Sequence, residues 1–211
     1  MKVKNKWNVS FIVIAVLTVI FTTLKVAIHS PFWIDKIVTA WFSHVPDSAI
    51  PFFKTITRMG NKKEIGGIAL LMLAWLLLKK RNYLGAALVA LATGIGNEIS
   101  KWIKDLFERP RPDLEHLVIV KSYSFPSGHA MVGMIIYFLI AYLIIEEMKS
   151  ITGKIIVGLL AGILLLLIGA SRIILHVHYP SDVFGGYAFG FIWVSLWIWL
   201  YQFIKSKWLV K

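Results

Sequence analysis

Three basic residues lie where long apolar segments of the chain end, beside aromatic and aliphatic neighbours. They are Lys104, Arg111 and Arg172. A cation in such a place is costly unless an anionic partner binds it. At an effective dielectric near 20, each cation within about 4 Å of a phosphate oxygen contributes on the order of 4 kcal/mol. The three together therefore predict a site for a dianionic phosphate.

A second polar group, Pro126-Ser127-Gly128-His129, opens another apolar segment. A helix that begins here directs free backbone N–H groups, and the positive end of its dipole, at a bound anion. Pro126 suits a helix start, and Gly128 lets the backbone approach a ligand closely. We expect Ser127 and Gly128 to bind the oxygens of the phosphate.

Two histidines provide the groups for a two-step transfer. Asp182 follows His178 by four residues, and Pro180 prevents one helix from containing both. In the first turn of the next helix, Asp182 can accept the Nδ1–H of His178 and fix the tautomer that presents Nε2. His178 is then predicted to be the nucleophile. His129 is predicted to protonate the leaving alkoxide and later to activate water.

The elements that must position these residues are predicted to be membrane helices. The 211-residue chain is 58% hydrophobic and 16% charged, with a mean hydropathy of +0.73, which is typical of a protein embedded in a bilayer. A helix crosses the hydrocarbon layer with roughly 20 apolar residues. We predict an all-α fold of one domain, residues 1–211, whose motif core is 101–185. Its six transmembrane helices are predicted at Trp7–Ile28, Ile65–Leu78, Tyr83–Phe107, Ala130–Ile145, Ile155–Leu175 and Val183–Phe203.

The distribution of lysine and arginine predicts that both termini are cytoplasmic. The two sides carry similar numbers of cations, but those on the side of the termini crowd into very short connections, which the positive-inside rule weighs most. All three polar groups then lie at the extracytoplasmic ends of the spans. We therefore expect a multi-pass protein of the cell membrane whose site opens at the outer face.

Residues 32–44, FWIDKIVTAWFSH, follow the first predicted span. As a helix, this segment places apolar and polar side chains on opposite sides. The pattern is typical of a short helix that lies in the membrane interface. We expect it to act as a surface anchor or lid without chemistry, and a role in gating the access of lipid is the alternative.

Composition disfavours several kinds of partner and cofactor. The chain has no cysteine, which excludes disulfides, thiolate metal sites and a cysteine nucleophile. Its formal net charge is +12, yet the basic residues form no stripe along a soluble face, so nucleic acid is not expected. Magnesium could be held by Asp105, Glu108, Asp113 and Glu115, but the three cations make a metal redundant. We expect no cofactor, no metal and no obligate protein partner.

The order and spacing of these residues resemble the three signature motifs of the type 2 phosphatidic acid phosphatase superfamily. The motifs read Lys104, six residues, Arg111-Pro112; then Pro126-Ser127-Gly128-His129; then Ser171-Arg172, five residues, His178, three residues and Asp182. No motif position departs from the pattern, and the six predicted spans extend the similarity over nearly the whole chain. Soluble haloperoxidases share the constellation, but the predicted spans disfavour that branch.

The resemblance implies a metal-independent phosphatase that forms a phosphohistidine. It implies that His178 is the nucleophile, that Asp182 orients it and that His129 is the acid. It also implies that the phosphoryl oxygens are bound by Lys104, Arg111, Ser127, Gly128 and Arg172.

Neighbouring residues provide alternatives to these assignments. His176 could be the reactive histidine, but it lacks a carboxylate at the right spacing. Lys101 and Arg109 could replace the motif cations, and only the six-residue spacing disfavours them. Arg109 is more simply a surface or headgroup contact. Glu98 is a functional candidate because it lies within a predicted span, or it pairs with Lys101 three residues on.

We expect an enzyme that hydrolyses a phosphomonoester or diphosphate on a membrane lipid. Phosphatidylglycerophosphate, phosphatidate and undecaprenyl diphosphate are the candidate substrates, because the motifs bind only the phosphate that all three share. A phosphotransferase with the same phosphohistidine is one alternative. A lipid transporter without catalysis is another, and it would have no use for His178 and Asp182.

Overall fold

The computed structural model describes residues 9–29 and 32–208. These residues contain eight α-helices and no strand, which confirms the predicted all-α fold. The helices are α1 (Val9–Ala27), α2 (Trp33–Phe42), α3 (Ile50–Arg58), α4 (Lys62–Ala74), α5 (Tyr83–Phe107), α6 (Gly128–Glu147), α7 (Ile151–Ile174) and α8 (Pro180–Trp208). A 3-10 turn, Asp47–Ala49, precedes α3, and a π-helical segment, Trp75–Lys80, continues α4.

Four of the described helices are long and apolar enough to cross a membrane, namely α1, α6, α7 and α8. α5 has the predicted bounds, but charged residues such as Glu98 and Lys101 in its second half lower its hydropathy. α4 has only 13 residues before the π-helical segment, and its first turn is charged. Length and composition therefore support four membrane-crossing helices, and the crossing by α4 and α5 stays a prediction.

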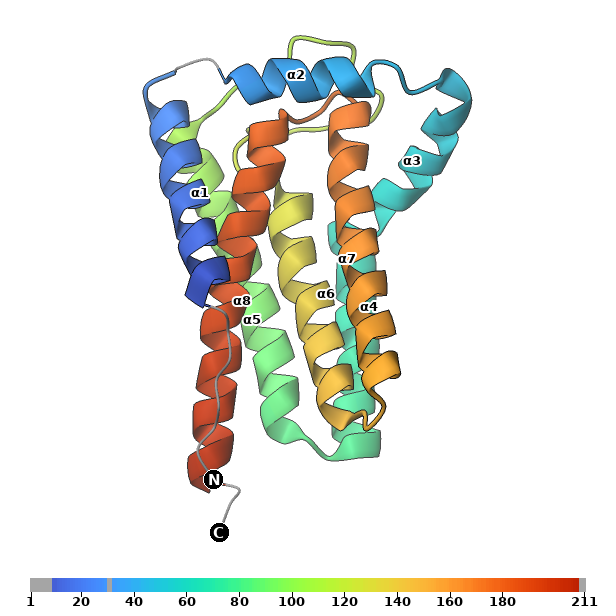
Figure 1. Cartoon of the computed structure of the whole chain (residues 1–211), viewed down its shortest axis with the longest axis vertical. Coiled ribbons are helices and arrows are strands. Elements are labelled where there is room, and N and C mark those ends of the chain that lie inside the picture. Colours follow the sequence, from blue (N-terminus) through green and yellow to red (C-terminus); the bar gives the residue numbers. More distant parts are fainter. Residues whose placement is uncertain (1–8, 30–31, 209–211) are drawn as a thin grey trace.

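The long helices stand side by side, and α2 lies across one end of the bundle (Figure 1). The loop after α5 and the α7–α8 connection lie at this same end. The α4–α5 and α6–α7 connections lie at the opposite end. α6 occupies the centre, where it packs against α5, α7 and α8. The three polar segments of the sequence are thereby gathered at one end of the molecule.

Two glycines let α8 pack closely against α6. A Cβ atom on Gly186 would lie 2.7 Å from Ser127 O, and one on Gly190 would lie 2.6 Å from Met131 O. Small residues four positions apart allow two membrane helices to approach in this way. The starts of α6 and α8 are thereby held together, and Ser127 N donates a hydrogen bond of 2.9 Å to Asp182 O.

The short helix predicted after the first span is present as α2, and one of its polar residues points into the protein. Trp33 and Trp41 are 67% and 80% exposed, as suits side chains in a membrane interface. Asp35 is only 7% exposed. α2 therefore contributes a buried carboxylate to the end of the bundle where the polar segments meet.

α3 has no counterpart among the predicted elements. It has nine residues, with Pro51 in its first turn, and it packs against α7. The short turn from α3 to α4 contains Gly60 and Asn61. This turn brings polar side chains towards the start of α6.

Candidate active site

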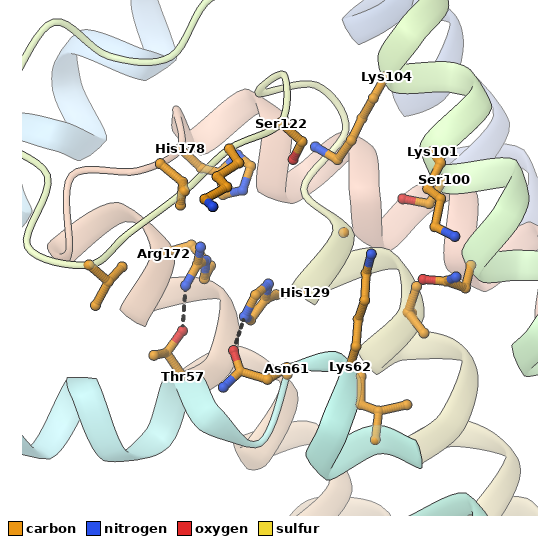
Figure 2. Close-up of a pocket in the computed structure, with 18 of the residues that line it drawn as sticks. Thr57, Asn61, Lys62, Ser100, Lys101, Lys104, Ser122, His129, Arg172 and His178 are labelled. Carbon is orange, nitrogen blue, oxygen red and sulfur yellow. Dashed lines mark hydrogen bonds between the residues drawn. The ribbon is translucent and has the colours of Figure 1, made fainter.

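One cavity of about 830 Å³ contains residues from all three polar segments. It is lined by Lys104, Arg111, Gly128, His129, Arg172 and His178, among others. Figure 2 shows Lys104, His129, Arg172 and His178 around the same space. Ser127 and Asp182 lie behind this lining, and both are fully buried. The structure thus brings together the residues that the sequence analysis selected from distant parts of the chain.

Helix starts place two of these segments. α6 begins at Gly128 and α8 begins at Pro180, so Asp182 lies in the first turn of α8 as expected. The first N–H groups of a helix have no partner within it. At the start of α6 they are available to an anion in the cavity.

Backbone carbonyl groups hold the candidate phosphate-binding cations in place. Lys104 Nζ donates to Tyr123 O at 2.6 Å and to Ser124 O at 3.2 Å. Arg111 Nε donates to Ser122 O at 2.7 Å, and its Nη1 donates to Val177 O at 2.5 Å. The loop after α5 is therefore closed around these two cations.

The third cation, Arg172, is only partly satisfied. Its Nη1 donates to Thr57 Oγ1 of α3 at 2.7 Å, as Figure 2 shows. Its Nε has no hydrogen-bond partner within the described residues, and neither has Ser127 Oγ. Arg172 lines the cavity and Ser127 lies behind its lining, so two buried polar atoms in or next to the cavity wall lack a partner within the described residues.

His178 is oriented through a hydroxyl group as well as by its carboxylate. Its Nδ1 lies 3.2 Å from Ser124 Oγ and 3.4 Å from Asp182 Oδ2. Ser124 Oγ donates to Asp182 Oδ2 at 2.5 Å, so it accepts the Nδ1–H of His178. The sequence predicted that Asp182 accepts the Nδ1–H of His178 directly. In the structure the two groups are in ion-pair contact at 3.4 Å, and the hydrogen bond of Nδ1 is with Ser124, which connects it to Asp182.

The other ring nitrogen of His178 is an acceptor. Its Nε2 lies 3.4 Å from Nη1 of Arg111, and a guanidinium group can only donate. This hydrogen-bond pattern assigns the proton to Nδ1 and a lone pair to Nε2. The tautomer agrees with the one that a nucleophilic His178 needs.

The surroundings of His178 lower its pKa well below the usual value. Burial is the main cause, followed by the positive charges of Arg172, Lys104 and Arg111. Both effects disfavour a charged imidazolium. The imidazole is therefore neutral near pH 7, and its Nε2 lone pair is available.

The turn between α3 and α4 contacts the second histidine. His129 Nε2 lies 3.0 Å from Asn61 Oδ1, a contact drawn in Figure 2. A Cβ atom on Gly60 would lie 2.5 Å from His129 Cδ2, so this turn approaches the ring without room for a side chain. Asn61 is a partner that fixes one orientation of the ring.

Of the residues considered as alternatives, His176 lies outside the cavity and Lys101 lines it. His176 contacts Glu115 O through its Nδ1 at 3.1 Å and does not line the cavity. Lys101 lines the cavity, but it pairs with Glu98 at 2.5 Å, which is the simpler of the two interpretations of Glu98.

Arg109 is not the surface or headgroup contact that the sequence suggested. Its side chain is 13% exposed and forms ion pairs with Asp35 and Asp182. The reason is that α2 and the start of α8 both offer carboxylates to the loop after α5.

The four acidic residues considered for magnesium do not gather. In the part of the chain that the structure describes, no group of three or more histidine, aspartate or glutamate side chains is arranged to hold a metal ion.

Sequence reasoning missed the contribution of several residues that contact the candidate site residues directly or, in the case of Asp35, through Arg109. They are Asp35, Thr57, Asn61, Arg109 and Ser124. Ser124 stands two residues before Pro126, so its closeness to the second motif was a usable signal. Arg109 lies within the first motif, but its sequence position does not reveal its ion pairs. The remaining three belong to segments without any motif, and only the fold brings them to the site.

Comparisons with known proteins agree with this geometry. The sequence profile of the PAP2 superfamily matches residues 83–206. Phosphatidylglycerophosphatase B of Bacillus subtilis (strain 168) is 33% identical over 138 residues, which are 65% of this chain and 68% of that protein.

Two solved structures have the same fold. The first transmembrane PAP2 type phosphatidylglycerolphosphate phosphatase from Bacillus subtilis matches with a TM-score of 0.81 and 26% identity, over 92% of this chain and 98% of that chain. Aquifex aeolicus LpxE matches with a TM-score of 0.62 and 18% identity, over 79% of this chain and 96% of that chain, and at this identity it shows the fold alone.

The profile covers more than half of the chain and includes all three polar segments. The resemblance inferred from the motifs is thereby confirmed. The protein belongs to the PAP2 superfamily and is a membrane phosphatase of the lipid phosphatase type.

Proposed function

We propose that this protein hydrolyses the terminal phosphomonoester of a membrane lipid through a phosphohistidine on His178. The observation that carries the proposal is that two buried polar atoms of the motif residues, Arg172 Nε and Ser127 Oγ, have no hydrogen-bond partner within the described residues. Arg172 is 4% exposed and Ser127 is 0% exposed. Buried polar atoms without partners are costly. A phosphoryl group bound beside His178 would satisfy both of them.

In the first step, the Nε2 lone pair of His178 attacks phosphorus, and the bond between phosphorus and the ester oxygen breaks. His129 donates a proton to that oxygen, so the lipid leaves as an alcohol. The imidazole gains positive charge as the P–N bond forms. Asp182, directly and through Ser124, stabilises that charge.

In the second step, His129 takes a proton from water as the water oxygen attacks phosphorus. The P–N bond breaks, which leaves inorganic phosphate and a neutral His178. Arg111, Arg172 and Lys104 stabilise the charge on the phosphoryl oxygens in both steps. No cofactor or metal takes part in either step.

The charges in the cavity favour a lipid with two anionic groups. In addition to the cations beside His178, the cavity is lined by Lys54, Lys62 and Lys121, and Lys62 points into it (Figure 2). Phosphatidylglycerophosphate carries a phosphodiester next to its terminal phosphomonoester. The relative from Bacillus subtilis is named for this lipid. We therefore place phosphatidylglycerophosphate ahead of undecaprenyl diphosphate and phosphatidate as the substrate.

The proposed location of the reaction is the extracytoplasmic face of the cell membrane. The cavity is lined in part by the loop after α5 and by the α7–α8 connection, and both segments lie at the end of the bundle near α2. The connections at the opposite end are short and basic, and they include Lys79, Lys80 and Lys149. Short basic connections favour the cytoplasmic side.

The test is to present the three lipids to the purified protein in detergent and to measure the inorganic phosphate released. We expect phosphatidylglycerophosphate to react fastest. Release is expected to vanish in His178→Ala and to persist in EDTA, while His176→Ala serves as the matched control with the wild-type rate. An unchanged rate in His178→Ala, or complete loss in EDTA, would contradict the proposal.

Two additions to this assay separate the finer alternatives. Lys62→Met is expected to raise KM for phosphatidylglycerophosphate and to leave KM for phosphatidate unchanged, because only the first lipid has a second phosphate to bind. An added alcohol acceptor is expected to leave phosphate release unchanged. A transferase would instead move the phosphoryl group to the acceptor and release less phosphate.

A further inference from the structure

Arg109 lies between two carboxylates from distant parts of the chain. It follows α5, and its Nη1 is 2.5 Å from Asp182 Oδ1 at the start of α8. Its Nη2 is 3.0 Å from Asp35 Oδ2 of α2. One guanidinium group therefore connects the interfacial helix to the aspartate that orients the candidate nucleophile.

This arrangement is buried and closed to the cavity. The side chains of Arg109, Asp35 and Asp182 are 13%, 10% and 0% exposed. The guanidinium carbon lies 5.1 Å from the ring centre of Phe32 and 4.3 Å from that of Tyr179. Arg109 is absent from the cavity lining. It is therefore placed to act on Asp182 and not on a phosphate.

The two oxygens of Asp182 have different donors. Oδ2 accepts hydrogen bonds from Ser124 Oγ at 2.5 Å and from Tyr179 N at 2.9 Å. Oδ2 is also the oxygen that lies 3.4 Å from His178 Nδ1. Oδ1 is the oxygen bound by Arg109. Loss of this donor would leave a buried carboxylate oxygen uncompensated and the plane of the carboxylate free to turn.

Asp35 binds the start of α8 as well as Arg109. Its Oδ1 accepts a hydrogen bond from Ser181 N at 2.7 Å, and its Oδ2 accepts one from Ser181 Oγ at 2.8 Å. A carboxylate at the N-terminus of a helix satisfies free N–H groups and is stabilised by the helix dipole. Asp35 thus fixes the position of the helix turn that carries Asp182.

We propose that Arg109 is a positioning residue that holds the carboxylate of Asp182 in the orientation required by His178, with Asp35 of α2 as its buried counter-charge. The inference rests on the proposed phosphohistidine function. If Arg109 and Asp35 act in this way, α2 supports the catalytic residues and is more than an anchor or lid.

The test compares Arg109→Met with Arg111→Met. Both variants lose a guanidinium group, and the two positions are two residues apart in the chain. kcat, KM and the inhibition constant of inorganic phosphate are measured for each variant. We expect Arg109→Met to lower kcat about tenfold or more, with KM and the inhibition constant changed less than about twofold. Arg111→Met is expected to raise both of these constants, because Arg111 lines the cavity.

A double-mutant cycle shows whether Arg109 acts through the aspartate. In an Asp182→Asn background, Arg109→Met is expected to change kcat by less than about twofold. Arg109→Lys keeps the charge but loses the fork that reaches two carboxylates, so partial recovery of kcat is expected. Asp35→Asn is expected to lower kcat while leaving the inhibition constant of phosphate unchanged.

Folding is checked by the elution profile and the thermal unfolding midpoint in detergent. If Arg109→Met does not fold, the Arg109→Lys and Asp35→Asn variants decide the question. An unchanged kcat in the folded variants overturns the inference. It is also overturned if Arg109→Met lowers kcat as much in the Asp182→Asn background as it does in the wild type. If the wild type releases no phosphate from any of the three lipids, the proposed function fails instead, and the two failures are therefore distinguishable.

Discussion

The candidate nucleophile His178 depends on residues that lower its pKa from the ordinary value of 6.5. Burial comes first among the causes, and the cations around the ring add to it. A lowered pKa keeps the imidazole unprotonated as the pH falls through 6.5, so the nucleophile is lost only at lower pH. The phosphate-binding cations therefore add to the effect of burial in keeping His178 unprotonated.

The lowered pKa of His178 determines where activity is lost on the acid side of the pH profile. The value of kcat/KM reports ionisations of the free enzyme, and we expect its acid limb to shift to higher pH in Arg111→Met, because one cation that lowers the pKa of His178 is gone. The measurement is kcat/KM from about pH 4.5 to about pH 8. The phosphate of the substrate ionises at the same pH with the wild type and with the variant, so its ionisation does not contribute to the difference between the two profiles. A limb that stays in place or moves to lower pH would contradict the account.

Single residues also show how far sequence reasoning reaches. The motif residues are recognisable because each has a chemical role and a fixed spacing, and the structure brings them to one cavity. Asn61 and Arg109 act through partners that are 68 and 73 residues away, respectively. Contacts at such separations are set by the packing of helices, which one sequence does not reveal.

Among the helices, close packing of α8 on α6 determines the position of the site. The contact between Gly186 and Ser127 O lies directly behind the candidate phosphate-binding segment. Gly186→Ala would place a Cβ atom 2.7 Å from that backbone oxygen, so α6 or α8 must shift.

We therefore predict that Gly186→Ala lowers both stability and activity. Overpacking costs about 1–3 kcal/mol, and the thermal unfolding midpoint in detergent is expected to fall by several degrees together with kcat/KM. Gly162→Ala in α7 is the matched control, because a Cβ atom there has no contact within 4 Å. Equal unfolding midpoints and equal rates in the two variants would show that the close contact between α6 and α8 does not determine the position of the site.

The helices differ in how well the sequence predicts them. The bounds of α5 were predicted correctly because a cluster of polar residues and two prolines end its apolar pattern. Pro180 correctly separated His178 from the helix that contains Asp182, although α8 begins at Pro180, three residues before the predicted span. α3 was missed because nine residues between two turns give too short a pattern, and the inward direction of Asp35 depends on partners from α5 and α8.

At the level of the whole molecule, the account requires the cavity and the short basic connections to lie on opposite sides of the membrane. The chain has no cysteine, so single cysteines can be introduced without background. Ile119 lies in the loop after α5 and is 91% exposed. Lys149 lies in the α6–α7 connection and is also exposed.

We predict that Ile119→Cys reacts with a membrane-impermeant maleimide in intact cells. Lys149→Cys is expected to react only after the membrane is opened. The reverse pattern would place the cavity on the cytoplasmic side. Reaction of both variants in intact cells would show that the two loops are on the same side.

The central claim is that His178 becomes covalently phosphorylated. The most direct measurement is to mix the enzyme with lipid labelled with radioactive phosphorus in its terminal phosphate, to stop the reaction within the first turnover, and to locate the label in peptides. We predict an acid-labile, base-stable label on His178 that is absent in His178→Ala. Phosphate release without any protein-bound label, or a label on another residue, would contradict the account.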